Sequence, residues 1–304
     1  GGDGDGDGGG GGSAATASHW DEAAVQLRLI VDDEEFVSAS GTTKHAHWMK
    51  LCEVVSRHPD AVPSLRGRAE AIIRSGLKRF TDETGRLWCA LADFFIRQGN
   101  FERARDVYEE AVDAVMTVRD FSVVFDAYAQ FEEAILTAKM EMEDEGDGEG
   151  AAPKEHDADE LDDLDELLEE GGDVDLRMAR LERLLDRRPL LLSSVLLRQS
   201  PHNVAQWLKR VKLVEKGPGG AAAAIRTFGE AVKTVDAAKA VGRAHELWVA
   251  FARYYERAGD VASARVVFEK ATNVNFRTVD DLASVWCAWA EMELRQERYD
   301  EALP

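Results

Sequence analysis

The sequence predicts an all-α protein, an α-α superhelix (solenoid) of stacked helical hairpins. Two segments, residues 87–112 and 247–272, are similar to each other along their whole length. In each segment, apolar residues recur at helical spacing on both sides of a glycine, Gly99 or Gly259. The first half of this pattern returns at intervals near 40 residues, and self-similarity at a fixed period is the signature of a repeat architecture.

Each repeat can be numbered from a large aromatic residue in its first helix. Six residues occupy this origin: Trp48, Trp88, Phe125, Trp207, Trp248 and Trp286. In the two similar segments, apolar residues follow the origin at +3, +4 and +6 and recur at +16, +20 and +23, which places each set on one face of a helix. The glycine at +11 supplies the positive φ that ends a helix. Each repeat is therefore expected to be a hairpin of two helices.

One interval between origins is about twice as long as the others. Successive origins are 40, 37, 82, 41 and 38 residues apart. The interval of 82 contains residues 141–173, with seventeen Asp and Glu against Lys154 alone. Because such a composition cannot bury a core, this insert is expected to be disordered. It would interrupt the hairpin that opens at Phe125, whose second helix would resume near Val174.

This register divides the chain into four parts: a disordered Gly/Asp-rich tail (residues 1–19), hairpin repeats (20–140), a disordered acidic insert (141–173) and further repeats (174–304). Trp20 matches the start of a second helix, whose partner helix would fall in the glycine-rich tail. We therefore expect an exposed apolar stripe on Val25, Leu27, Leu29 and Ile30. Tyr299 also matches the start of a second helix, and there is no initiator Met, so we expect an internal fragment of a longer protein.

The charge and the cysteines bound the class of protein. The net charge of -21 comes almost entirely from the insert and from Asp3, Asp5 and Asp7, so the repeats are nearly neutral. The three cysteines show no CxxC spacing, which indicates reduced thiols in the cytosol or nucleus. No apolar run is long enough to cross a bilayer, and the first residues lack the pattern of a signal peptide. We expect neither membrane association nor secretion.

No motif points to an enzyme. The glycine-rich residues 217–220 lack the Gly-Lys-Ser/Thr ending of a phosphate loop and stand where the other repeats turn. His45 and His47 would point in different directions from one helix, which disfavours a zinc site. Because no catalytic constellation stands out from solvated helix faces, we expect no catalytic residue, cofactor, metal or small-molecule substrate.

Two segments are candidates for binding. An arginine stripe recurs at helical spacing on Arg177, Arg180, Arg183, Arg187 and Arg188, and it could contact RNA phosphates or a partner, or be a solvated face paired with nearby carboxylates. The acidic insert contains Leu161, Leu164, Leu167 and Leu168 at spacings of 3, 3 and 1. This spacing would allow a helix to form in the groove of a partner, although a disordered spacer is the default expectation.

The repeats resemble known helical repeats. The Trp-x2-aromatic-Ala-x-aromatic-Glu first helix and the Ala-Arg-x2-aromatic-Glu-x-Ala second helix are similar to the half-a-TPR (HAT) repeat, a relative of the TPR hairpin. Residues 80–112, 116–133, 187–202 (RRPLLLSSVLLRQSPH) and 274–295 resemble the SYF-type pre-mRNA-splicing factor family, also called the XPA-binding protein family. The resemblance runs from about Trp20 to the C-terminus. The glycine-rich start and the acidic insert depart from the family pattern.

The resemblance implies a nuclear scaffold of the spliceosome, in the NineTeen-associated complex, that acts in splicing through protein contacts. The partners it implies are a crooked-neck-type HAT protein, an Isy-type factor, an Aquarius-type helicase and the U2 particle, with RNA contact secondary. It also implies a link to transcription-coupled repair. The alternatives are a HAT scaffold of mRNA 3′-end processing, in which residues 187–202 are not expected, and a direct RNA-binding repeat protein.

Overall fold

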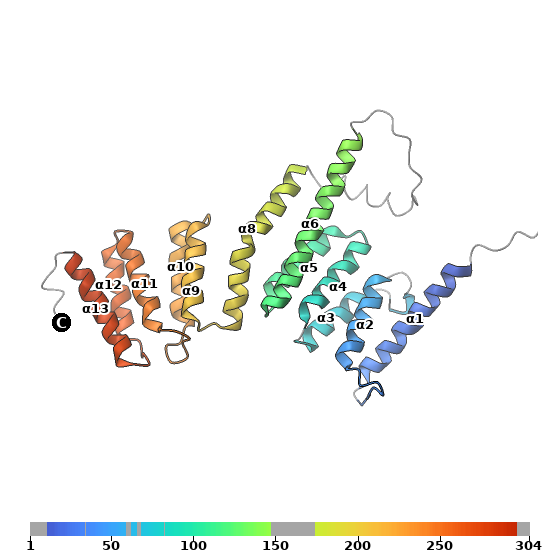
Figure 1. The fold of residues 1–304 in the computed structure, drawn as a ribbon, viewed down its shortest axis with the longest axis horizontal. Helices are drawn as coiled ribbons and strands as arrows, with labels where there is room; N and C mark the ends of the chain where they lie inside the picture. The colour runs from blue at the N-terminus through green and yellow to red at the C-terminus, as the bar shows by residue number, and fades with distance from the viewer. Residues whose placement is uncertain are drawn as a thin grey trace, which may run out of the picture. The chain divides into compact units, whose positions relative to one another are not determined.

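The computed structural model describes residues 11–33, 35–58, 62–65, 68–81, 83–146 and 174–296. Within these ranges the regular elements are helices, joined by turns and one isolated bridge between Asn203 and Val241. The chain divides into two compact units, residues 1–186 and 187–304, which are described one at a time. The fold is the all-α helical solenoid that the sequence predicts (Figure 1).

The first unit stacks hairpins in chain order. Its elements are α1 (Gly11–Asp32), α2 (Lys44–Arg57), the short 3-10 helix η1 (Pro63–Leu65), α3 (Ala69–Arg79), α4 (Thr84–Arg97), α5 (Phe101–Ala114), α6 (Val118–Gly146) and the beginning of α8 (Val174–Gln199). Helix α4 packs against its own second helix α5 and against both neighbouring first helices, α2 and α6. Helices α2, α4 and α6 carry the predicted origins Trp48, Trp88 and Phe125.

The second unit repeats this arrangement. It contains the rest of α8, then α9 (Val204–Lys216), α10 (Gly220–Thr234), α11 (Ala244–Arg257), α12 (Val261–Thr272) and α13 (Val279–Arg295). Helix α11 packs against α9, α10, α12 and α13. The first helices α9, α11 and α13 carry the origins Trp207, Trp248 and Trp286.

The predicted hairpin turns are present in both units. Gly99 and Gly259, at +11, have φ of 72° and 81°, a left-handed conformation that favours glycine. The residue after each glycine caps the next helix: Asn100 accepts a hydrogen bond from the backbone N–H of Arg103, and Asp260 accepts one from the backbone N–H of Ser263. In both hairpins, therefore, the glycine ends the first helix and the residue after it caps the second.

The predicted periodicity forms the core. In the α4–α5 and α11–α12 hairpins every residue at +3, +4, +6, +16, +20 and +23 is buried. Small alanines at +4 and +16 allow the two helices to approach closely, while the aromatic ring at +20 fills the space between hairpins. Trp286 departs from the other origins because it is 47% exposed and stacks on Trp289. The second helix of its hairpin was predicted from Tyr299, outside the described residues.

Buried ion pairs join successive hairpins at two equivalent places. Arg105, at +17, donates to both carboxylate oxygens of Glu132, at +7 of the next first helix, over 2.5 and 3.1 Å. Arg265 and Glu293 occupy the same two positions in the second unit and are joined over 2.7 and 2.6 Å. Glu132 and Glu293 are both buried. A bidentate guanidinium–carboxylate pair fixes direction as well as distance, so it sets the angle between hairpins.

Aspartates at -5 from the origin form a second link between hairpins. Asp120, in the first turn of α6, accepts hydrogen bonds from the backbone N–H of Gly85 over 3.1 Å and from the Thr117 hydroxyl over 2.7 Å. Asp281, in the first turn of α13, lies 2.6 Å from Nδ1 of His245. Gly85 and His245 are both at -3 in the preceding first helix. The aspartate therefore ties each of these first helices to the one before it.

One helix boundary agrees with its predicted position, and two other helices extend beyond theirs. Helix α8 begins at Val174, where the interrupted hairpin was predicted to resume. Helix α1 begins at Gly11 rather than near Trp20, in an alanine-containing run that favours helix, and α6 continues to Gly146. In the predicted apolar stripe on α1, Leu29 is exposed, whereas Val25, Leu27 and Ile30 are half-buried because α1 packs against α2.

Candidate interaction grooves

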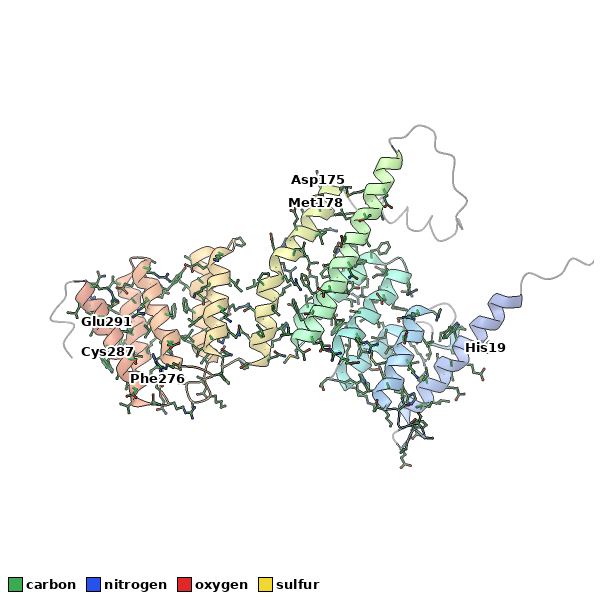
Figure 2. The ribbon with its side chains drawn as sticks, in the orientation of Figure 1. His19, Asp175, Met178, Phe276, Cys287 and Glu291 are labelled. Carbon is green, nitrogen blue, oxygen red and sulfur yellow. The ribbon has the colours of Figure 1, made fainter. Side chains whose placement is uncertain are left out.

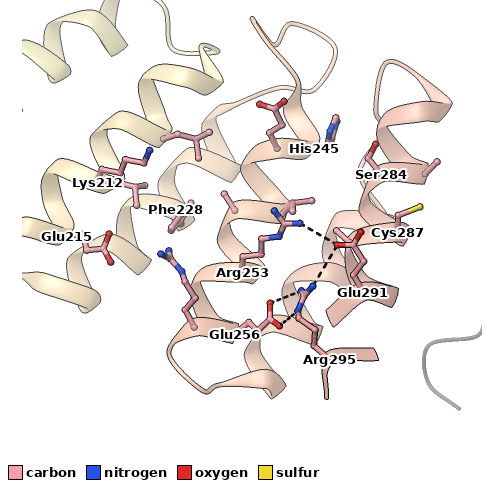
Figure 3. Close-up of a pocket in the computed structure, with 18 of the residues that line it drawn as sticks. Lys212, Glu215, Phe228, His245, Arg253, Glu256, Ser284, Cys287, Glu291 and Arg295 are labelled. Carbon is pink, nitrogen blue, oxygen red and sulfur yellow. Dashed lines mark hydrogen bonds and ion pairs between the residues drawn. The ribbon is translucent and has the colours of Figure 1, made fainter. Parts of the chain in front are cut away.

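The first helices of the second unit line a groove with a volume of about 1050 Å³. Its sides come from α9, α11 and α13, and Phe228 of α10 lies beneath (Figure 3). The floor consists of apolar or small side chains: Leu208, Val211, Val249, Ala250, Ala283 and Ala288. A groove of this size with an apolar floor can accept side chains from another molecule.

The groove-lining residues follow a register of their own. On α11 the positions -2, +1, +5 and +9 are Glu246, Val249, Arg253 and Arg257, and all four line the groove. On α13 the positions -2, +1, +5 and +9 line it as well, with Ser284, Cys287, Glu291 and Arg295. This face is adjacent to the packing face at 0, +3 and +4. The groove register could be read from the sequence once the hairpin orientation is known, but sequence reasoning alone missed it.

The rim of the groove is charged and braced. Arg295 donates to both carboxylate oxygens of Glu256 over 2.8 and 3.1 Å, and Arg253 lies 3.6 Å from Glu291 (Figure 3). Arg295 also lies 3.8 Å from Glu291. The pKa of Arg295 is raised, chiefly by its hydrogen bonds to Glu256. These pairs hold α11 and α13 at a fixed separation and leave the apolar floor open between them.

His245 and Asp281 close the end of the groove where the first helices begin. His245 is buried, and its Nδ1 is within hydrogen-bond distance of the Asp281 carboxylate. A hydrogen bond with Thr278, together with the one from His245, holds the pKa of Asp281 below its ordinary value. Asp281 therefore stays ionised near neutral pH and keeps this end of the groove anchored to α13.

The first unit has a smaller groove on the equivalent face. It has a volume of about 500 Å³ and lies between α2 and α4, with Val123 of α6 at one edge. The same positions line it: Ala46, Met49, Glu53 and Arg57 on α2, and Arg86, Cys89 and Asp93 on α4. In both units the groove is therefore lined by the same face of the first helices.

The cysteines of the first unit are not activated. Burial raises the pKa of the Cys52 thiol to about 12. Burial, together with the charge of Asp93, raises the pKa of Cys89 to about 12. Since the thiolate is the reactive form, both side chains are thiols at neutral pH. Cys287, in the larger groove, is exposed.

The structure does not place the predicted arginine stripe on one exposed face. Arg177 is buried, and burial lowers its pKa, because this side of α8 faces α5 and α6. Arg180 is half-buried and lies 3.7 Å from Glu102 of α5. Met178, next to Arg177 in the sequence, is exposed near the start of α8 (Figure 2).

The remaining members of the stripe have mixed surroundings. Arg183 and Arg188 are exposed and Arg187 is half-buried. Contact between these residues and RNA or a partner stays a prediction. The four leucines of the predicted partner-binding acidic helix, Leu161, Leu164, Leu167 and Leu168, lie outside the described residues.

Two negative observations hold for the described residues. Among them, no group of three or more His, Cys, Asp or Glu side chains is arranged to hold a metal ion. None of the described helices is both long enough and apolar enough to span a bilayer.

Comparison with known families covers nearly the whole chain. Residues 13–235 match the family model described as the pre-mRNA-splicing factor SYF1 middle HAT repeat. Residues 237–304 match the Syf1/CRNKL1 C-terminal HAT repeat of pre-mRNA-splicing factors. The two matches meet between α10 and α11, so both include repeats of the second unit.

Individual relatives show the same similarity. The chain is 54% identical to the human pre-mRNA-splicing factor SYF1 over 283 residues, 93% of this chain and 30% of the relative. It is 52% identical to the Drosophila melanogaster syf1 homolog over 94% of this chain and 30% of the relative. The Schizosaccharomyces pombe splicing factor cwf3 is 39% identical over 93% of this chain and 32% of the relative. The chain spans about a third of the length of these proteins.

Proposed function

Because the chain belongs to the SYF1 family of pre-mRNA-splicing factors, we propose that it is part of a nuclear scaffold of the spliceosome. It acts in pre-mRNA splicing by holding other proteins on the first-helix faces of its hairpins. The observation that carries this proposal is the open groove of the second unit, whose walls are braced by the Arg295–Glu256 and Arg253–Glu291 pairs. A braced groove with an apolar floor is suited to binding a partner without changing shape.

The finer assignment rests on the family. We propose membership of the NineTeen-associated complex, with a crooked-neck-type HAT protein, an Isy-type factor, an Aquarius-type helicase and the U2 particle as partners. A role in transcription-coupled repair belongs to the same proposal. A scaffold of mRNA 3′-end processing is less well supported, because both matching family models are described as pre-mRNA-splicing factors.

Direct RNA binding by the arginine stripe is supported only in part. A row that tracks phosphates needs several exposed cations on one side of a helix. Arg183 and Arg188 are exposed, but residues five apart lie about 140° apart around a helix, so they do not share one side. Arg177 is buried, and Arg180 is paired with Glu102.

Affinity purification from nuclear extract tests the proposed function. The tagged chain is expected to recover spliceosomal proteins. A variant with Ala250→Arg and Cys287→Arg, which fills the groove of the second unit, is expected to lose at least some of them. Val266→Arg, an exposed position on the second helix α12 outside the groove, is the matched control and should retain them. Recovery of 3′-end cleavage factors without spliceosomal proteins would contradict the proposal.

A further inference from the structure

Three lysines share one face of α9, and the middle one lines the groove. Lys209, Lys212 and Lys216 are spaced at i, i+3 and i+7, so they share one face of the helix. Lys212 lines the groove directly. Lys209 and Lys216 do not line the groove themselves but flank Lys212 on the same exposed face of α9. All three lysines are exposed.

The opposite side of the groove carries carboxylates together with Arg295. Asp280 and Glu291 of α13 line that side, together with Glu246 at the start of α11. On the α9 side Glu215 is the acidic residue that lines the groove. The α9 side, where three lysines stand against Glu215, is therefore net positive, whereas the α13 side, where Asp280 and Glu291 stand against Arg295, is net negative. Glu291 is itself paired with Arg253 and Arg295. A binding partner with uniform charge would be attracted to one wall and repelled by the other.

This charge pattern disfavours a nucleic acid as the occupant. A phosphate backbone that crosses the groove would place negative charge against Asp280 and Glu291. Single-stranded nucleic acids also stack their bases on accessible aromatic rings. Phe228, the aromatic side chain that lines this groove, is only 3% exposed and already stacks on Phe251. The floor therefore offers aliphatic contact rather than a stacking surface.

We propose that this groove binds a segment of a partner protein that carries acidic side chains at one end and apolar side chains after them. The acidic end lies over Lys209, Lys212 and Lys216, and the apolar side chains enter the floor formed by Val211, Val249 and Ala250. This inference rests on the proposed scaffold function and adds the chemistry of the partner. The lysines set the orientation of the segment, since reversal would place its acidic end on α13.

Binding of a synthetic peptide to the whole 304-residue chain tests the inference. The probe is a fluorescent peptide of about 16 residues with three acidic side chains at one end, followed by leucine and alanine at helical spacing. Fluorescence anisotropy measures its affinity. The triple variant K209E/K212E/K216E is expected to bind the peptide about tenfold more weakly or worse, because three favourable charge contacts become unfavourable. A peptide with lysines in place of the acidic residues should show the opposite preference.

A matched variant separates a local effect from a general effect of charge. R226E/K233E/K239E makes the same change in net charge on exposed residues of the second unit that do not line the groove. It should bind the acidic peptide about as well as the unmodified chain, within about twofold. Equal weakening by the two triple variants would overturn the inference. Circular dichroism verifies that each variant is folded, and Lys212→Ala replaces the triple variant if it is not.

The exposed thiol of Cys287 locates the peptide. Cys287 lines the groove of the second unit, and Cys89 lines the groove of the first. Bound peptide is expected to slow alkylation of Cys287 and to leave that of Cys89 unchanged, as measured by mass spectrometry. Absence of protection at Cys287 would overturn the inference, as would displacement of the peptide by polyuridine RNA that binds with the same dependence on the three lysines. Recovery of spliceosomal proteins by a chain that binds no acidic peptide would overturn the inference and leave the proposed function standing.

Discussion

Two glycines in helix interiors have opposite surroundings. A Cβ added to Gly76 in α3 would lie 2.2 Å from Nε1 of the buried Trp48, whereas a Cβ on Gly229 in α10 would meet nothing within 4 Å. Gly76→Ala is therefore expected to destabilise the chain by about 2 kcal/mol through overpacking. Gly229→Ala should stabilise it by about 0.5–1 kcal/mol through helix propensity. Chemical denaturation measures both changes, and a similar effect at the two sites would refute the packing argument.

The buried Arg105–Glu132 pair predicts an asymmetric response to mutation. Arg105→Ala leaves the buried Glu132 carboxylate without its bidentate partner, which is expected to cost about 3 kcal/mol. Replacing both residues with Met removes the uncompensated charge and should recover most of that loss. The control is Arg28→Ala, which breaks an exposed pair with Asp32 and should change the free energy of unfolding by less than about 0.5 kcal/mol.

Part of this residue-scale detail could be read from the sequence. The repeat register identified Arg105 and Arg265 at one position and Glu132 and Glu293 at another. Periodicity, however, relates residues within one helix. It does not show that +17 of one hairpin meets +7 of the next, because that pairing depends on the angle between hairpins. Neither the Arg105–Glu132 pair nor the groove could therefore be predicted from the sequence alone.

At the scale of the element, two equivalent helices use different cap residues. Asn100 caps α5 and Asp260 caps α12. Hydrogen bonds with Ser263 lower the pKa of Asp260, so its contribution to stability is present above its unfolded pKa of about 3.9 and is lost as the pH falls through its folded pKa. Asn100 does not titrate.

The expected outcome is a selective loss of protection in acid. The amide of Ser263 should lose hydrogen-exchange protection, relative to its intrinsic rate, below about pH 4, while the amide of Arg103 keeps its protection. With Asp260→Asn, the amide of Ser263 should keep its hydrogen-exchange protection in acid, as the amide of Arg103 does. Parallel loss at both amides in the unmodified chain would show that global unfolding, rather than the cap, is responsible.

Helix α8 shows what periodicity can and cannot decide. Its start at Val174 was predicted because the interval between origins left room for one resumed helix. The arginines were predicted to share one exposed face, whereas Arg177 is buried. The packing of Arg177 beside Arg105, Glu102 and Glu132 explains which side is buried. Carboxylates on α5 and α6 are what make a buried arginine tolerable there.

At the scale of the whole molecule, a destabilising mutation in one hairpin should reduce the stability of that hairpin and of the hairpins that contact it. In repeat proteins each unit contacts the adjacent ones, so stability is a sum of local terms. Arg105→Ala is expected to reduce hydrogen-exchange protection in α4, α5 and α6 and to leave α11, α12 and α13 unchanged, and Arg265→Ala should do the reverse. Uniform loss across both units in either variant would show that the chain unfolds as one cooperative body.

Helix α11 carries two registers on adjacent faces. Its positions +3, +4 and +6 pack the core, whereas +1, +5 and +9 line the groove, and of these +5 and +9 are exposed. A mutation in the first set changes whether the hairpin folds, and a mutation in the second set changes what it holds. Duplicated hairpins can therefore diverge in what they recognise while their architecture is preserved. Lys212 at +5 of α9 and Glu291 at +5 of α13 show how two copies of one helix can differ in charge at a position that lines the groove.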